Sequence, residues 1–152
     1  MTDPIIADIQ AAAATSFTGD RVLARAQLES VWSRIAANAH PMHECALSHA
    51  MADMQDDPAD ELAWDLRALA AALRCTDADV QTHSPLSTIA AFMPSLHTNL
   101  AEDYFKLGDF TRSRDHLATA RSFLGDLPDD PYGRMIRRGI ERLALKLGSA
   151  AA

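Results

Sequence analysis

The side chains best suited to chemistry lie close together in one stretch, HPMHECALSHAMAD, at residues 40–53. The stretch holds His40, His43, Cys45, His49 and Asp53. If it is helical, Cys45, His49 and Asp53 follow one another at intervals of four and share a face. His, Cys and Asp are all ligands of transition metals, so this ladder could hold a metal ion.

Three observations argue against a metal. Cys45 and His49 fall on the stripe that should pack inside a helix pair, His43 lies off that stripe, and the spacing matches no established metal motif. The chain also contains no G-x-S-x-G, H-E-x-x-H, P-loop or G-x-G-x-x-G motif. We therefore expect histidines that serve packing, no metal, no cofactor and no catalytic centre, in a protein that is not an enzyme.

Composition limits the partners. The net charge of −7 disfavours nucleic acid, because phosphate contacts need clustered positive charge. No run approaches 18 apolar residues, and the N-terminus lacks the basic-then-apolar pattern of a signal peptide, so we expect no membrane partner and a cytoplasmic location.

Cys45 and Cys75 lack a metal-ligand spacing and are expected to be reduced thiols. At 152 residues the chain is expected to form a single domain, 1–152.

The elements that would position these side chains are clearest at residues 94–127. The first half of this stretch carries an apolar helical stripe, at Leu96, Leu100, Ala101, Tyr104 and Leu107. Gly108 and Asp109 then end one helix and cap the next. The second half again shows steps of three and four, at Phe110, Ser113, Leu117, Ala120 and Leu124. The pattern predicts two amphipathic helices joined by a tight turn.

This stretch resembles a tetratricopeptide repeat, a helix–turn–helix unit of about 34 residues. Leu100, Ala101 and Tyr104 match the L-G-x2-Y positions, and Ser113 to Ala120 match the A-x3-F-x2-A positions of the second helix. His97 stands where the family has Trp. The resemblance implies an all-α, tetratricopeptide-like α-α superhelix of about three helix–turn–helix units plus a C-terminal capping helix.

The other units are more degenerate. The first, about 4–38, repeats the turn as Gly19-Asp20, and the middle one, about 40–75, turns at Asp57-Pro58 without a glycine. Residues 75–85 are predicted to form a polar loop and 86–92 a short helical piece before the third unit, about 94–127. The capping helix, about 130–147, shows a basic face that we interpret as solvated, with docking on anionic lipid as the alternative.

In tetratricopeptide proteins the first helix of each pair lines a concave groove that holds a partner's peptide or helix. Transferred to this chain, the resemblance implies a partner-binding groove at His43, Asp53, Met54, Thr98, Glu102, Phe105 and Lys106. Further groove positions follow on the same three helices, at Ile6, Ile9, Ala13, Ser16, Phe17, Ala46, Ala50 and Ser95. Because Asp53 and Glu102 would stand in the groove, we expect no recognition of acidic C-termini.

Three functions follow. The first is a non-enzymatic adaptor or scaffold that binds a protein or peptide in the groove. The second is a structural module that forms a homodimer through Ile5, Ile6 and Ile9. The third is the metal-binding alternative described above.

Overall fold

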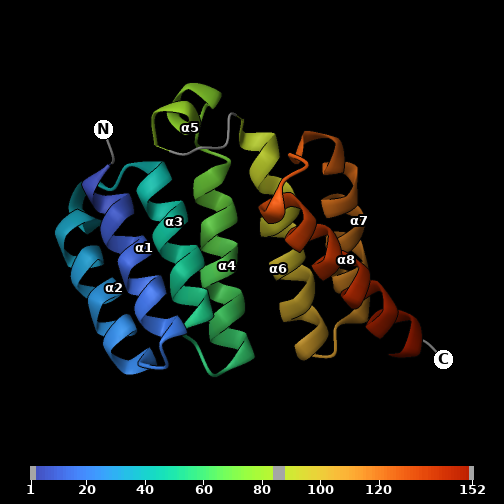
Figure 1. The fold of residues 1–152 in the computed structure, drawn as a ribbon. Coiled ribbons are helices and arrows are strands. Elements are labelled where there is room, and N and C mark those ends of the chain that lie inside the picture. The colour runs from blue at the N-terminus through green and yellow to red at the C-terminus, as the bar shows by residue number, and fades with distance from the viewer. Residues whose placement is uncertain (1–2, 84–87, 151–152) are drawn as a thin grey trace.

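The chain is all-α. The computed structural model describes residues 3–83 and 88–150, and these ranges contain helices and no strand. Figure 1 shows the helices standing side by side along the molecule, from α1 and α2 at one end to α7 and α8 at the other. The α-helices are α1 (Pro4–Phe17), α2 (Arg21–Ile35), α3 (Pro41–Asp53), α4 (Pro58–Ala72), α5 (Asp77–His83), α6 (Met93–Lys106), α7 (Phe110–Ser122) and α8 (Pro131–Ala150). Three short 3₁₀ helices accompany them: η1 (Ala36–Asn38), η2 (Ile89–Phe92) and η3 (Leu124–Asp126).

The helices pack as consecutive pairs. α1 lies against α2, α3 against α4 and α6 against α7, and α8 packs across α6 and α7. The pairs meet where α3 contacts α1 and α2, and where α6 contacts α4. The prediction of an all-α chain is confirmed, and no helix in the described residues is long and apolar enough to cross a membrane.

Aspartates begin most of these helices. Oδ1 of Asp3 accepts a hydrogen bond from the N–H of Ile5 (2.9 Å), and Asp57 and Asp109 cap α4 and α7 in the same manner. Pro at the first helical position has no N–H to leave unsatisfied, which favours the starts of α1 and α4. Asp3-Pro4, Asp57-Pro58 and Gly108-Asp109 therefore mark real helix starts.

Small side chains allow the paired helices to approach closely. Ala24 on α2, and Ala101 and Ala120 on α6 and α7, are fully buried. Between α6 and α7, the hydroxyl of Ser113 donates to the carbonyl of Ala101 (2.6 Å), which satisfies this buried polar group. Close packing of this kind needs small residues on facing surfaces.

A stack of rings fills the wider part of the α6–α7 interface. The ring of His116 lies between His97 and Tyr104, with centroid separations of 5.3 and 5.4 Å. Burial lowers the pKa of both His97 and His116, so both imidazoles are favoured in the neutral form that such a stack requires. His97 thus contributes an aromatic ring at the position where the tetratricopeptide pattern has Trp.

Helix α5 was not predicted. The sequence favoured a polar loop over 75–85, whereas Asp77–His83 is helical, and the side chain of Val80 within this helix is fully buried. The start of α5 is a capping box: Oδ2 of Asp79 accepts from the N–H of Thr76 (2.8 Å), and Oγ1 of Thr76 accepts from the N–H of Asp79 (3.2 Å). The predicted helical piece at 86–92 appears as η2, and its first two positions lie outside the described residues.

The turn at Gly108 offers a test of the α6–α7 pair. Its φ of +79° lies in the left-handed region that side chains disfavour, so Gly108→Ala should destabilise the chain by about 1 kcal/mol. Gly148, which is exposed within α8, provides the matched control, because Gly148→Ala should stabilise slightly through helix propensity. Urea unfolding followed by circular dichroism measures both. Equal or greater stability of Gly108→Ala would contradict this role of the turn.

Candidate functional site

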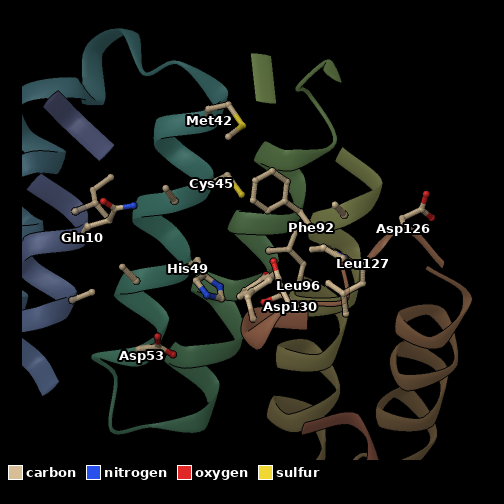
Figure 2. A pocket seen from close by; sticks show the side chains of 18 of the residues that line it. Gln10, Met42, Cys45, His49, Asp53, Phe92, Leu96, Asp126, Leu127 and Asp130 are labelled. Atoms are coloured by element: carbon tan, nitrogen blue, oxygen red, sulfur yellow. The ribbon is translucent and has the colours of Figure 1, made fainter. Parts of the chain in front are cut away.

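A cavity of about 840 Å³ opens between the first helices of the pairs. Figure 2 shows it bounded by α1 and α3 on one side and by α6 and the chain around Leu127 on the other. Its lining is mostly apolar, with Ala13, Ala46 and Ala50 small enough to leave the space open. The larger apolar side chains that line it are Ile9, Met42, Met54, Phe92, Leu96 and Leu127.

Helix α3 supplies one continuous wall. Met42, Cys45, Ala46, His49 and Asp53 line the cavity at steps of three and four, the spacing that places side chains on one helical face. Because α3 stands between α1 and α4, its opposite side is occupied by its neighbours. Of the polar residues in the stretch 40–53, Cys45, His49 and Asp53 therefore line this cavity.

The opposite wall is an irregular segment, and one arginine holds it in place. The guanidinium of Arg137 on α8 donates to the carbonyls of Leu124 (3.2 Å), Leu127 (3.2 Å) and Pro128 (3.3 Å). Gly133 also permits a close approach, since a Cβ there would stand 1.8 Å from the carbonyl oxygen of Pro128. The wall is thus fixed by α8 and by a glycine that no other residue could replace without a shift of the chain.

The charge of the cavity is negative. Asp53, Asp126 and Asp130 line it, and none of the described lining residues is Lys or Arg. Burial raises the pKa of the Asp53 carboxyl, and Glu61 adds to the rise, whereas His49 and Lys106 oppose it. A cationic group entering the cavity would be attracted to these carboxylates.

The structure divides the polar residues of the stretch 40–53 between two places. Cys45, His49 and Asp53 face the cavity, where burial raises the pKa of the Cys45 thiol to about 12 and keeps it neutral. A neutral thiol is neither a nucleophile nor a good metal ligand. The Nδ1 atom of His49 accepts from the side-chain amide of Asn99 (3.1 Å).

His43 belongs to a different cluster, at the end of the molecule near α5. Its Nε2 donates to Oδ2 of Asp3 (2.8 Å), and Nδ1 of His83 donates to the same oxygen (2.5 Å). The ring of His40 is tilted against that of His83, with the ring centroids 4.7 Å apart, and its Nδ1 accepts from the N–H of Met42 to cap α3. These bonds tie the start of α1 to α3 and α5. Both carboxylate oxygens of Asp3 are thereby used in hydrogen bonds within the chain.

The predicted groove residues are spread over several environments. Asp53 and Met54 line the cavity. Thr98 is buried, and its hydroxyl donates to the carbonyl of Pro94 (2.5 Å). Lys106 pairs with Glu61 across the helices at 2.9 Å.

One further groove position, Phe105, faces the C-terminal helix. Phe105 lies beside Lys146 of α8 and against Phe110, whose ring centroid is 5.3 Å away, in a second small hollow. Glu102 is half-buried near Lys106. Of the other groove positions, Ile9, Ala13, Ala46, Ala50 and Ser95 do line the main cavity.

The burial of Ile9 reduces the predicted homodimer surface. It is 5% exposed and packs in the core beside α2 and α3, so it contributes little to an outer face. Ile5 and Ile6 remain partly exposed. Self-association through this helix stays a prediction.

Sequence reasoning missed one group of polar residues entirely. Glu61 and Asp65 on α4 and Asp103 on α6 bring carboxylate oxygens within 4.8 Å of one another. The signal available in the sequence was the interval of four between Glu61 and Asp65, together with an acid at 103 between the apolar Leu100 and Tyr104.

Comparison of the chain with protein-family models, with curated proteins and with solved structures gave no match in any of the three. The site must therefore be interpreted from its geometry and charge.

The Asp3 cluster makes a testable contribution to stability. Burial opposes ionisation of Asp3, but hydrogen bonds from His43, the Ile6 N–H and His83 outweigh it and lower its pKa. Asn caps helices as well as Asp does, so Asp3→Asn removes the charge and keeps the cap. We expect a loss of about 1–2 kcal/mol at pH 7, typical of hydrogen bonds to a charged group.

The sign of the pH dependence follows from the lowered pKa. The advantage of the wild type over Asp3→Asn should be full above about pH 4, the ordinary Asp range, and should shrink as the pH falls towards the pKa in the folded chain. Urea unfolding between pH 2.5 and 7 measures it. Asp20, which caps α2 without a histidine partner, provides the control, and an equal loss in Asp20→Asn would contradict the assignment.

Proposed function

We propose that the three helix pairs form a short tetratricopeptide-like array whose concave side binds an apolar, positively charged segment of a partner protein. In this proposal the chain is a non-enzymatic adaptor, and the cavity between α1, α3 and α6 is its binding groove. The observation that carries it is the lining: mostly apolar, with three aspartates and, among the described residues, no Lys or Arg.

The size of the cavity favours a peptide segment. About 840 Å³ accommodates several large side chains, as the apolar face of a two-turn helix with anchors at i, i+3, i+4 and i+7 would present. Met42 and Met54 supply unbranched, adaptable walls, which suit an apolar face of varied shape. The cavity volume also falls in the range of small-molecule sites, so a small ligand is the outcome against which the peptide must be tested.

The charge selects the kind of segment. Three carboxylates at the rim and wall raise the local concentration of Lys- or Arg-bearing chains and repel acidic ones. This extends the sequence-based expectation that acidic C-termini are not recognised. Cationic side chains between apolar anchors would place charge against Asp53 and Asp126 while the anchors enter the cavity.

Two labelled 14-residue peptides with identical Leu positions, one filled with Lys and one with Glu, test this proposal. Fluorescence anisotropy should show saturable binding of the Leu/Lys peptide and binding at least about tenfold weaker for the Leu/Glu peptide, since about 1.4 kcal/mol separates them if one carboxylate–ammonium contact is gained. The affinity of the Leu/Lys peptide should fall as salt is raised. Equal affinities for the two peptides would contradict the proposed selection.

Substitutions then locate the site. Ala46→Phe should fill the cavity and abolish binding of the Leu/Lys peptide, whereas Ala63→Phe, on the exposed side of α4, should leave it unchanged. Asp126→Asn should weaken binding several-fold, and Asp129→Asn, an exposed neighbour outside the cavity, should not. Binding that survives Ala46→Phe at full strength would place the peptide elsewhere.

A further inference from the structure

Three carboxylates meet at the contact between α4 and α6. Glu61 and Asp65 are four residues apart and share the face of α4 that packs on α6, where Asp103 faces them. One oxygen from each lies within 4.8 Å of the others. Asp65 is 2% exposed and Asp103 is fully buried, so two of the three acids are removed from water.

The buried acids lack hydrogen-bond donors. Within the described residues, no donor from outside the cluster bonds to either oxygen of Asp103 or to Oδ1 of Asp65. The hydrogen bonds open to Asp103 are those that a proton on its own carboxyl would make to Asp65 and Glu61. The nearest ammonium, Lys106 Nζ, bonds to both oxygens of Glu61 at 2.9 Å. An ionised carboxylate without a partner in the interior is among the most costly arrangements in a protein, and such groups are normally paired or bound to a metal.

The net charge of the three carboxylates and their neighbours indicates what kind of ligand would neutralise them. Three carboxylates and one ammonium sum to −2, which one divalent cation neutralises. His49 and Asp53 of α3 and Glu102 of α6 also face this region, and together they do not supply the missing positive charge. Shared protons are the competing solution, since burial and the neighbouring acids raise the pKa of both Asp65 and Asp103.

We propose that Glu61, Asp65 and Asp103 form a binding site for a hard divalent cation of the Mg²⁺, Mn²⁺ and Ca²⁺ class. Carboxylate oxygens are the ligands that these ions prefer. Each carboxylate oxygen has a second lone pair, so Glu61 can hold Lys106 and still coordinate the ion. Glu61 is also the least buried of the three, and its side provides the entry path and room for water ligands. The proposal does not rest on peptide binding in the cavity.

The ligand geometry requires only a small closure. An ion bound at about 2.1 Å brings neighbouring oxygens of an octahedron to about 3.0 Å, compared with the upper limit of 4.8 Å in the metal-free arrangement. Rotation of three side chains on two packed helices covers this difference. The i, i+4 pair on α4 and the single acid on α6 then hold the ion from both sides of the contact.

Manganese is the probe for the test, because its binding is followed both by calorimetry and by the loss of the free-ion EPR signal. The full chain, stripped with EDTA and dialysed, should bind one Mn²⁺ per chain and melt at a higher temperature when Mn²⁺ is present. Binding near neutral pH should also release protons, seen as a dependence of the heat on the buffer, because the metal-free acids hold protons that the ion displaces.

Substitution distinguishes this site from the alternatives. Loss of a residue that only hydrogen-bonds to a metal ligand weakens metal binding about 10–100-fold. Because Asp103 is proposed as a direct ligand, Asp103→Asn should weaken Mn²⁺ binding by more than this. Asp60→Asn, an exposed acid beside Glu61 with the same change of charge, should bind as the wild type does. Circular dichroism confirms that each variant is folded, and Glu61→Gln provides a second variant in case Asp103→Asn is not.

Two results would overturn the proposal. Absence of saturable binding of Mn²⁺, Mg²⁺ or Ca²⁺, with unchanged melting, would leave shared protons as the solution for the buried acids. Binding that survives Asp103→Asn and is lost in His83→Ala would place the ion on the Asp3, His43 and His83 cluster.

Discussion

The contact between α4 and α6 joins the two halves of the molecule. One end of this contact is apolar, and the other end buries carboxyl groups. At one end Ala68, Ala72 and Leu96 form an apolar core that any pair of helices could use. At the other end the same helices bury Asp65 and Asp103 without donors. The apolar end favours close packing, and close packing removes the acids from water. The position of α6, and with it one wall of the cavity, therefore depends on how these carboxylates are neutralised.

Much of the fold could be predicted because its signals are local. Asp3-Pro4, Asp57-Pro58 and Gly108-Asp109 mark helix boundaries through caps and turn conformations that involve only neighbouring residues. Helix α5 was missed because seven polar-rich residues carry no long periodicity, and its one buried anchor, Val80, is recognisable only once α3 and α4 are placed. Its capping box at Thr76 was a local signal that could have been used.

The candidate site was harder to predict because it depends on contacts between distant segments. The tetratricopeptide resemblance placed Asp53 and Met54 in a groove, and both line the cavity. The same reasoning placed Phe105 in a groove, but α8 packs beside it, and its path follows from the bonds of Arg137 to the carbonyls of residues 124–128. Nothing in the pattern around Phe105 indicates those bonds. His43 likewise shares its helix with Asp53, yet its partners are Asp3 and His83, 40 residues away on either side.

The cavity and the acidic contact are electrostatically connected through α3. Asp53 lines the cavity, and its carboxyl also interacts with Glu61 and Asp65 of the buried group. A divalent cation at Asp103 would make this region less negative, and so would reduce the attraction of the cavity for a cationic segment. By linkage, a bound cationic segment would weaken the cation by the same factor. If both proposals hold, the two ligands therefore compete through charge alone, without sharing a single contact.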